Sequence, residues 1–167
     1  MEIDELFDDD SFDPEKLFDE NQYSTLIIDR EGFSKKQNST ADLIESLLEP
    51  HLTRAESEEI FAELKKANAQ QMMVKAIGTT RGDAQKKALT AACWECGLDF
   101  SPHFVFFAEL VCNSGFEVAM EAFTVIQEME NKPSREEIGA VEEIISKQPE
   151  PANAMVPELE SYIKSLH

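Results

Sequence analysis

The stretch that decides the fold is Asp83-Ala84-Gln85-Lys86-Lys87-Ala88-Leu89-Thr90, because it recurs in outline further along the chain. The second copy is Glu117-Val118-Ala119-Met120-Glu121-Ala122-Phe123-Thr124, which also begins with an acidic residue and shares an alanine and the final threonine. Most residues in both copies favour helices. Recurrence at this distance predicts that each copy is one helix of a repeated structural unit.

A second pair of segments precedes these two helices. Gly82 overlays Gly115, and Gln70-Gln71-Met72-Met73-Val74-Lys75-Ala76-Ile77 overlays His103-Phe104-Val105-Phe106-Phe107-Ala108-Glu109-Leu110 at an offset of 33. With one residue inserted after Gly115, the rest of each unit overlays as well. Each unit therefore consists of a helix, a turn and a longer helix. Because one helical hairpin cannot bury its apolar face alone, the pattern predicts hairpins packed on one another.

The repeated unit resembles the HEAT and armadillo-like families of helical repeats. The resemblance is carried by the acidic start at Asp83, the basic residues after it, and Ala88-Leu89, as in the second helix of such repeats. The second copy departs, with Met120 and Glu121 where basic residues are usual. The match covers about residues 53–131. It implies a short α-solenoid of stacked antiparallel helix pairs that presents a helical surface to proteins or peptides, with a non-repeat helical bundle as the alternative.

Helix-start signals recur from residue 39 onward. Capping boxes are expected at Ser39 with Asp42, Thr53 with Glu56 and Ser134 with Glu137, and further N-caps at Asp83 and at Ser101 before Pro102. The helix from Pro102 is apolar over most of its circumference, which predicts a central position. The other expected helices include 70–77, 83–96, 116–130, 135–147 and 157–166. We therefore expect an all-α fold, with a helical-repeat domain over 39–167.

Residues 1–38 form a separate, acidic and mostly irregular N-terminal segment in this interpretation. Leu6–Phe12 recurs eleven residues later as Leu17–Tyr23, and 23–29 is a candidate for a brief extended stretch. The aromatic residues of the tandem are expected to contact a partner: Phe7, Phe12, Phe18 and Tyr23. The segment docks on its own helices beside Lys86 and Lys87, or it is a motif offered to another protein.

The charge of the chain limits its partners. It has 15 Lys and Arg against 34 Asp and Glu, a net charge of −19, of which the first 31 residues carry −10. Phosphate backbones and anionic lipids repel such a chain, which argues against nucleic-acid and membrane partners. A basic protein partner is compatible with it, although better solubility is the simpler consequence. Because no export signal or apolar span is evident, we expect a cytoplasmic protein.

No arrangement of residues points to catalysis, so the chain is not expected to be an enzyme. Four residues are spaced as possible zinc ligands: Cys93, Cys96, His103 and Cys112. However, Cys93 and Cys96 share a helical stripe with Leu89 and Ala92, which favours packing of both thiols in the core. A possible calcium loop from Asp9 to Glu20 has Pro14 where the turn glycine is required. We therefore expect no metal and no cofactor.

Trp94 is the most informative candidate for a contact residue. The overlay sets it opposite Glu128, a polar position that is expected to face outward, and Lys87, Ala91 and Trp94 follow one line at helical spacing. Aromatic residues beside basic ones are typical anchors of protein interfaces. The alternative is that Trp94 closes the core or is covered by a terminal segment. The expected function is a protein-binding adaptor that uses Lys86, Lys87 and Trp94, and the alternative is an acidic inhibitor that masks a basic, nucleic-acid-binding partner.

Overall fold

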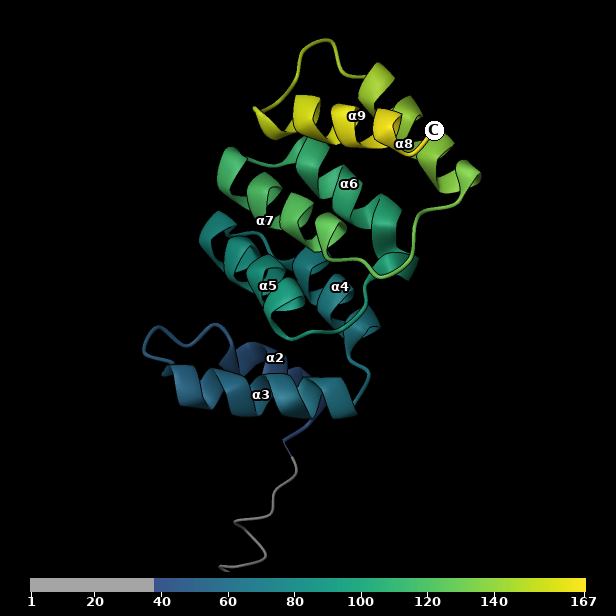
Figure 1. The fold of residues 1–167 in the computed structure, drawn as a ribbon. Coiled ribbons are helices and arrows are strands. Elements are labelled where there is room, and N and C mark those ends of the chain that lie inside the picture. The colour runs from purple at the N-terminus through teal and green to yellow at the C-terminus, as the bar shows by residue number, and fades with distance from the viewer. Residues whose placement is uncertain (1–37) are drawn as a thin grey trace, which may run out of the picture. The chain divides into compact units, whose positions relative to one another are not determined.

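The computed structural model describes residues 38–167 (Figure 1). All regular structure in this range is helical, which confirms the all-α prediction. The helices are α2 (Thr40–Ser46), α3 (Arg54–Lys66), α4 (Gln70–Thr79), α5 (Asp83–Glu95), the 3₁₀ turn η2 (Ser101–His103), α6 (Phe104–Asn113), α7 (Phe116–Gln127), α8 (Arg135–Ser146) and α9 (Met155–Ser165). The N-terminal segment lies outside the described residues, and with it Phe7, Phe12, Phe18, Tyr23, the extended stretch and the calcium-loop candidate.

Three helices begin with the capping boxes that the sequence predicts. At α2, Asp42 N–H donates to Ser39 Oγ over 3.2 Å, and Ser39 N–H donates to Asp42 Oδ2 over 3.0 Å. The same reciprocal pairs form between Thr53 and Glu56 at α3 and between Ser134 and Glu137 at α8. Each box satisfies two backbone donors that the first helical turn leaves without partners, and an N-cap of this kind stabilises its helix by about 1 kcal/mol.

Two predicted N-caps are wrong. Gly82, and not Asp83, is the N-cap of α5. Asp83 is the first helical residue, and the positive end of the helix dipole stabilises its negative charge there. Ser101 does not cap α6, because its hydroxyl donates to Asp99 Oδ1 and residues 101–103 form a 3₁₀ turn before the helix.

The last helix begins at Met155, two residues before the predicted start at Pro157. The cause is Asn153, whose side-chain oxygen accepts the Met155 N–H over 2.8 Å. The amide of the same side chain donates to the Val111 and Ser114 carbonyls over 2.8 and 2.9 Å. Asn153 therefore starts α9 and fastens that start to the end of α6.

Consecutive helices pack on one another in pairs: α2 on α3, α4 on α5, α6 on α7, and α8 on α9 (Figure 1). Neighbouring pairs meet through α2 and α4, through α5 and α7, and through the packing of α8 and α9 on α6. Five residues of α6 are buried: Phe104, Phe107, Ala108, Val111 and Cys112. The predicted central position of this helix is confirmed.

The aromatic part of the core gathers around Phe107, which is fully buried. Its ring meets Phe100 edge to face at a centroid distance of 5.5 Å, and it meets Phe106 in the same manner at 5.3 Å. Phe100 comes from the loop after α5, so this contact ties that loop to α6. Edge-to-face pairs of this kind add about 0.5–1.5 kcal/mol to the burial of the rings.

The buried positions correct the register of the repeat. Gly82 and Gly115 do overlay, since they are the N-caps of α5 and α7. In the first helices, α4 and α6, buried Met73 corresponds to Phe107 and Ile77 to Val111, an offset of 34 instead of 33. In the second helices, α5 and α7, buried Leu89 corresponds to Ala122 and Cys93 to Ile126, an offset of 33. No residue is therefore inserted after Gly115. The loop between the two helices is one residue shorter in the second unit, 114–115 against 80–82.

Candidate interaction surface on helices α5 and α7

Trp94 lies on the outer side of α5 with 38% of its surface exposed. The alternative in which it closes the core is therefore wrong. In the corrected register it overlays Gln127, which is exposed as well, instead of Glu128. Helix geometry places Trp94 about 100° around the helix from the buried Cys93, on the side away from Ala92, which is also buried.

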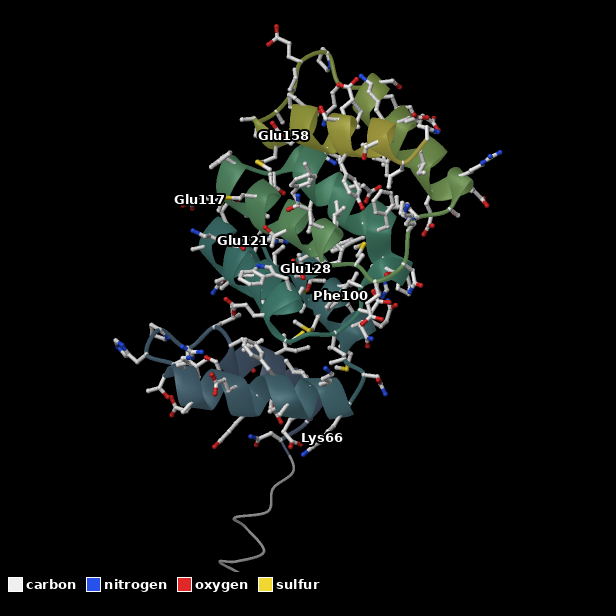
Figure 2. The ribbon with its side chains drawn as sticks, viewed as in Figure 1. Lys66, Phe100, Glu117, Glu121, Glu128 and Glu158 are labelled. Carbon is white, nitrogen blue, oxygen red and sulfur yellow. The ribbon has the colours of Figure 1, made fainter. Side chains whose placement is uncertain are left out.

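Two polar contacts join α5 to α7 along this side. Lys87 Nζ lies 3.2 Å from Glu117 Oε1, and the Trp94 indole N–H donates to Glu121 Oε2 over 2.9 Å. Glu117 and Glu121 lie on α7 and Glu128 is its C-cap (Figure 2), and their spacings of four and seven residues place them on one helix face. The predicted line of Lys87 and Trp94 therefore faces a line of carboxylates, and the bond to Glu121 fixes the orientation of the indole ring.

Lys86 does not belong to this line. Lys86 and Lys87 are both half-buried, but Lys86 lies at spacings of four and seven from Thr90 and Cys93, both of which are buried. Its backbone carbonyl accepts the Thr90 hydroxyl over 2.7 Å. The structure therefore brings Lys87 and Trp94 together and places Lys86 on the neighbouring, inward-facing stripe.

The surface also has an apolar part that sequence reasoning missed. Phe116 is 50% exposed and Met120 is 39% exposed, and both lie on α7 one turn apart. Together with Trp94 they are three of the four large apolar side chains that are exposed within residues 38–167; the fourth is Met72 on α4. The available signal in the sequence was Met120, an apolar residue that the corrected register sets opposite Lys87. Clustered exposed apolar side chains mark interaction sites more often than single ones do.

Carboxylates outnumber cations around Trp94. Burial raises the pKa of Glu95, and the negative charge of Glu121 raises it further. Lys87 is paired with Glu117, and the ammonium of Lys65 lies beside Gly97, 3.6 Å from the position that a Cβ would take there. The remaining excess of carboxylates would attract an incoming cation to this end of the surface.

Asp99 holds together the two loops that follow α5 and α7. Its Oδ1 accepts the Ser101 N–H over 2.9 Å, the Ser101 hydroxyl, and the Glu130 N–H over 3.3 Å. Its Oδ2 accepts from the Asn131 side chain over 3.1 Å, and the Asn131 N–H donates to Ser101 Oγ over 3.0 Å. One carboxylate thus joins segments that are about 30 residues apart in the chain.

The protonation of Asp99 is set by two opposing effects. Partial burial on its own raises the pKa of this carboxyl, but the hydrogen bonds from Ser101, Glu130 and Asn131 together lower it below its ordinary value of 3.8. The carboxylate is therefore charged at neutral pH, and its negative form is the one that the loops stabilise.

A pocket of about 320 Å³ opens where these loops meet the ends of α5 and α7. Trp94 and three acidic residues line it, and the ammonium of Lys65 lies beside Gly97 in its wall. The lining residues are Cys93, Trp94, Gly97, Leu98, Asp99, Phe100, Val125, Glu128 and Glu130. Gly97 adopts a φ of +65° after the end of α5, a conformation that glycine tolerates better than other residues. The turn at Gly97 brings Asp99 round to the end of α7.

A second, more apolar hollow of about 420 Å³ lies between α2 and α4. Its walls include the exposed Met72, with Lys75 and Glu45 at the same site. It is separate from the surface on α5 and α7.

The three cysteines are free thiols in the core, as the helical stripe predicts for Cys93 and Cys96. Burial raises the pKa of Cys93 well above its ordinary value, and the neighbouring Cys96 adds to the effect. His103 is half-buried on η2, where burial lowers its pKa. Within residues 38–167, no group of three or more His, Cys, Asp or Glu residues is arranged to hold a metal ion.

Comparison with protein families, with curated proteins and with solved structures gives no match to this chain. Every helix in residues 38–167 is too short or too polar to cross a bilayer. The case for function therefore depends on the surface geometry described above.

Proposed function

We propose that this chain is a cytoplasmic, non-catalytic adaptor of the short α-solenoid type, which binds a protein or peptide on the surface formed by α5 and α7. The observation that carries the proposal is Trp94, a partly exposed aromatic residue that lines a pocket and donates a hydrogen bond to Glu121. Tryptophan is among the residues most enriched at the energetic centres of interfaces. Because its ring is already oriented, little conformational entropy is lost when a partner covers it.

The apolar neighbours on α7 support the same surface. Phe116 and Met120 add exposed apolar area beside the carboxylates of Glu117 and Glu121. Apolar anchors within a polar rim are the usual composition of a protein interface. The pairwise packing of successive helices supports the solenoid arrangement, in which equivalent second helices such as α5 and α7 lie side by side and form a continuous face.

Trp94→Ala is expected to lower retention of a specific partner at least about tenfold, the effect of removing an interface residue worth more than about 1.4 kcal/mol. The chain should still fold with a moderate loss of stability, since Trp94 is 38% exposed and its hydrogen bond contributes about 1 kcal/mol. The measurement is quantitative mass spectrometry of proteins retained from native extract by the immobilised full chain, with thermal unfolding of each variant alongside. Lys87→Ala should also lower retention of the partner, but by less, because Glu117, the partner in its ion pair, is 72% exposed and screened by solvent.

Met72→Ala is the matched control, because Met72 has a similar exposed fraction, 43%, and lies on α4 away from this surface. Proteins that are lost with Trp94→Ala and kept with Met72→Ala are partners of the α5 and α7 surface. The reverse pattern would move binding to the hollow between α2 and α4 and would reject the proposal.

An acidic inhibitor that masks a basic, nucleic-acid-binding partner is the second candidate, and the excess of carboxylates around Trp94 favours it. Salt dependence separates the two functions. An aromatic-anchored partner should stay largely bound when the salt is raised from 0.1 M to 1 M, where the Debye length falls from about 10 Å to about 3 Å. A partner held mainly by charge should lose most of its retention over the same range. The measurement is partner retention in a salt series on the unmodified chain.

A further inference from the structure

The pocket beside Trp94 lies where two helices end. α5 ends at Glu95 and α7 ends at Gln127, and the residues that follow each helix line the pocket. The last carbonyl groups of a helix carry a partial negative charge of about half an elementary charge. Two such ends, together with the carboxylates of Asp99, Glu128 and Glu130, meet around one hollow of about 320 Å³. Lys65 is the cation beside the hollow, next to Gly97, and the three carboxylates outnumber it, so the chemistry of this site favours a positively charged group.

The three carboxylates are not equally available to a ligand. Asp99 is occupied by the hydrogen bonds that join the two loops. The side chains of Glu128 and Glu130 are exposed and form no hydrogen bond or ion pair with other described residues. Glu128 follows α7 directly and belongs to the same face as Glu121, which orients the indole. An aromatic ring and an unpaired carboxylate therefore border the same pocket.

We propose that this pocket receives an arginine side chain of the protein partner, with the guanidinium against the Trp94 ring and paired with Glu128. The inference rests on the proposed function, for which it names the chemistry of the partner. Arginine fits better than lysine because its planar, weakly hydrated cation stacks on aromatic rings and binds a carboxylate through two parallel hydrogen bonds. Tryptophan is also the aromatic residue that attracts cations most strongly. A metal ion fits less well, since no metal-binding group of three is arranged within residues 38–167.

The sequence contains one tryptophan, so the indole resonance of Trp94 reports on this pocket without background. The probes are three capped tripeptides, Ac-Gly-Arg-Gly-NH₂, its lysine analogue and its citrulline analogue, which is neutral and nearly the same shape as arginine. Each is titrated into ¹⁵N-labelled protein while the indole N–H resonance is followed. We expect a saturable shift with the arginine probe, a weaker affinity for lysine, and an affinity at least about fivefold lower for citrulline, because the neutral probe loses the cation–π and ionic contacts.

Two variants test the role of the carboxylate. Glu128→Gln should weaken binding of the arginine probe at least about threefold, since it removes the charge that pairs with the guanidinium. Glu136→Gln on α8 is the matched control, because it removes the same net charge from an exposed residue that does not line the pocket. Equal losses with both variants, or equal affinity for arginine and citrulline, would overturn the inference, as would the absence of any saturable shift.

The outcome is distinguishable from failure of the proposed function. If the Trp94-dependent partners are captured but the arginine probe does not bind, the surface binds its partner by other chemistry. In that case only the assignment of an arginine to the pocket is rejected. If no captured protein depends on Trp94, the proposed function falls, and the inference about a partner's arginine falls with it.

Discussion

Phe107→Ala is expected to remove about 3–5 kcal/mol from the free energy of unfolding, the usual cost of deleting a fully buried phenylalanine ring. The ring has no exposed surface, and the edge-to-face contacts with Phe100 and Phe106 disappear with it. Because small domains are stabilised by only about 5–15 kcal/mol, the loss is a large fraction of the total. The measurement is urea unfolding followed by circular dichroism.

Phe116→Ala is the matched control for this prediction. Phe116 is 50% exposed at the first position of α7, so the same change in chemistry should cost less than about 1 kcal/mol. If Phe107→Ala does not fold, Phe107→Leu, which leaves a smaller cavity, should still be less stable than Phe116→Ala. A similar small effect for both alanine variants would contradict the central position of α6.

Asp99→Asn is expected to lower the free energy of unfolding by about 2 kcal/mol, the second-largest loss of stability after Phe107→Ala. The amide that replaces one carboxylate oxygen is a donor, so one of the existing donors from Ser101, Glu130 or Asn131 loses its acceptor, and the bonds that remain lose their ionic character. Asp83→Asn is the control, because Asp83 is exposed in the first turn of α5 and its charge contributes less than about 1 kcal/mol there. Equal losses for the two variants, measured by urea unfolding, would contradict the joining of the loops by Asp99.

The difference between the unmodified chain and Asp99→Asn should also depend on pH. The pKa of Asp99 is lowered by folding, so its contribution to stability is fully present above the ordinary value of 3.8 and is lost as the pH falls through the lower, folded value. Unfolding curves over a pH series should therefore show the two proteins converging in strong acid, where the protonated carboxyl is as neutral as the amide. A difference that widens towards low pH would contradict this assignment.

Features that depend on residues three or four apart could be predicted from the sequence. Ser39, Thr53 and Ser134 each begin a helix as expected, because a capping box needs only the side chain and backbone of one helical turn. The core position of Cys93 and Cys96 was predicted from the same periodicity. These local patterns establish an all-α chain, but they do not say how its helices meet.

Features that depend on loops could not be predicted in the same way. The repeat offset differs between first and second helices because the loop before Gly115 is one residue shorter than the loop before Gly82, and an overlay of sequences alone placed that difference elsewhere. The bonds from Asp99 reach Glu130 and Asn131, which are 31 and 32 residues away and come near only in the folded chain. The spacing of Asp99 and Ser101 was the available signal, since an aspartate often accepts from the backbone two residues later.

The candidate surface was predicted in part. Trp94 and Lys87 could be assigned to one line from helical spacing, whereas their carboxylate neighbours and the pocket required the packing of α5 on α7. Lys86 was assigned to the surface together with Lys87, as a basic pair that could receive the acidic N-terminal segment. Adjacent helical residues point about 100° apart, and burial of the stripe at Thr90 and Cys93 decides which lysine belongs to the surface.

The buried thiols allow the rate at which the helices open to be measured. Cys93 and Cys112 are completely buried, and burial raises the pKa of both, so an alkylating reagent can reach their thiolates only after the surrounding helices separate. Labelling at high reagent concentration would then proceed at the opening rate itself, and at low concentration in proportion to the population of the open state. A comparison of the two residues by mass spectrometry would reveal whether α5 and α6 open together or one before the other.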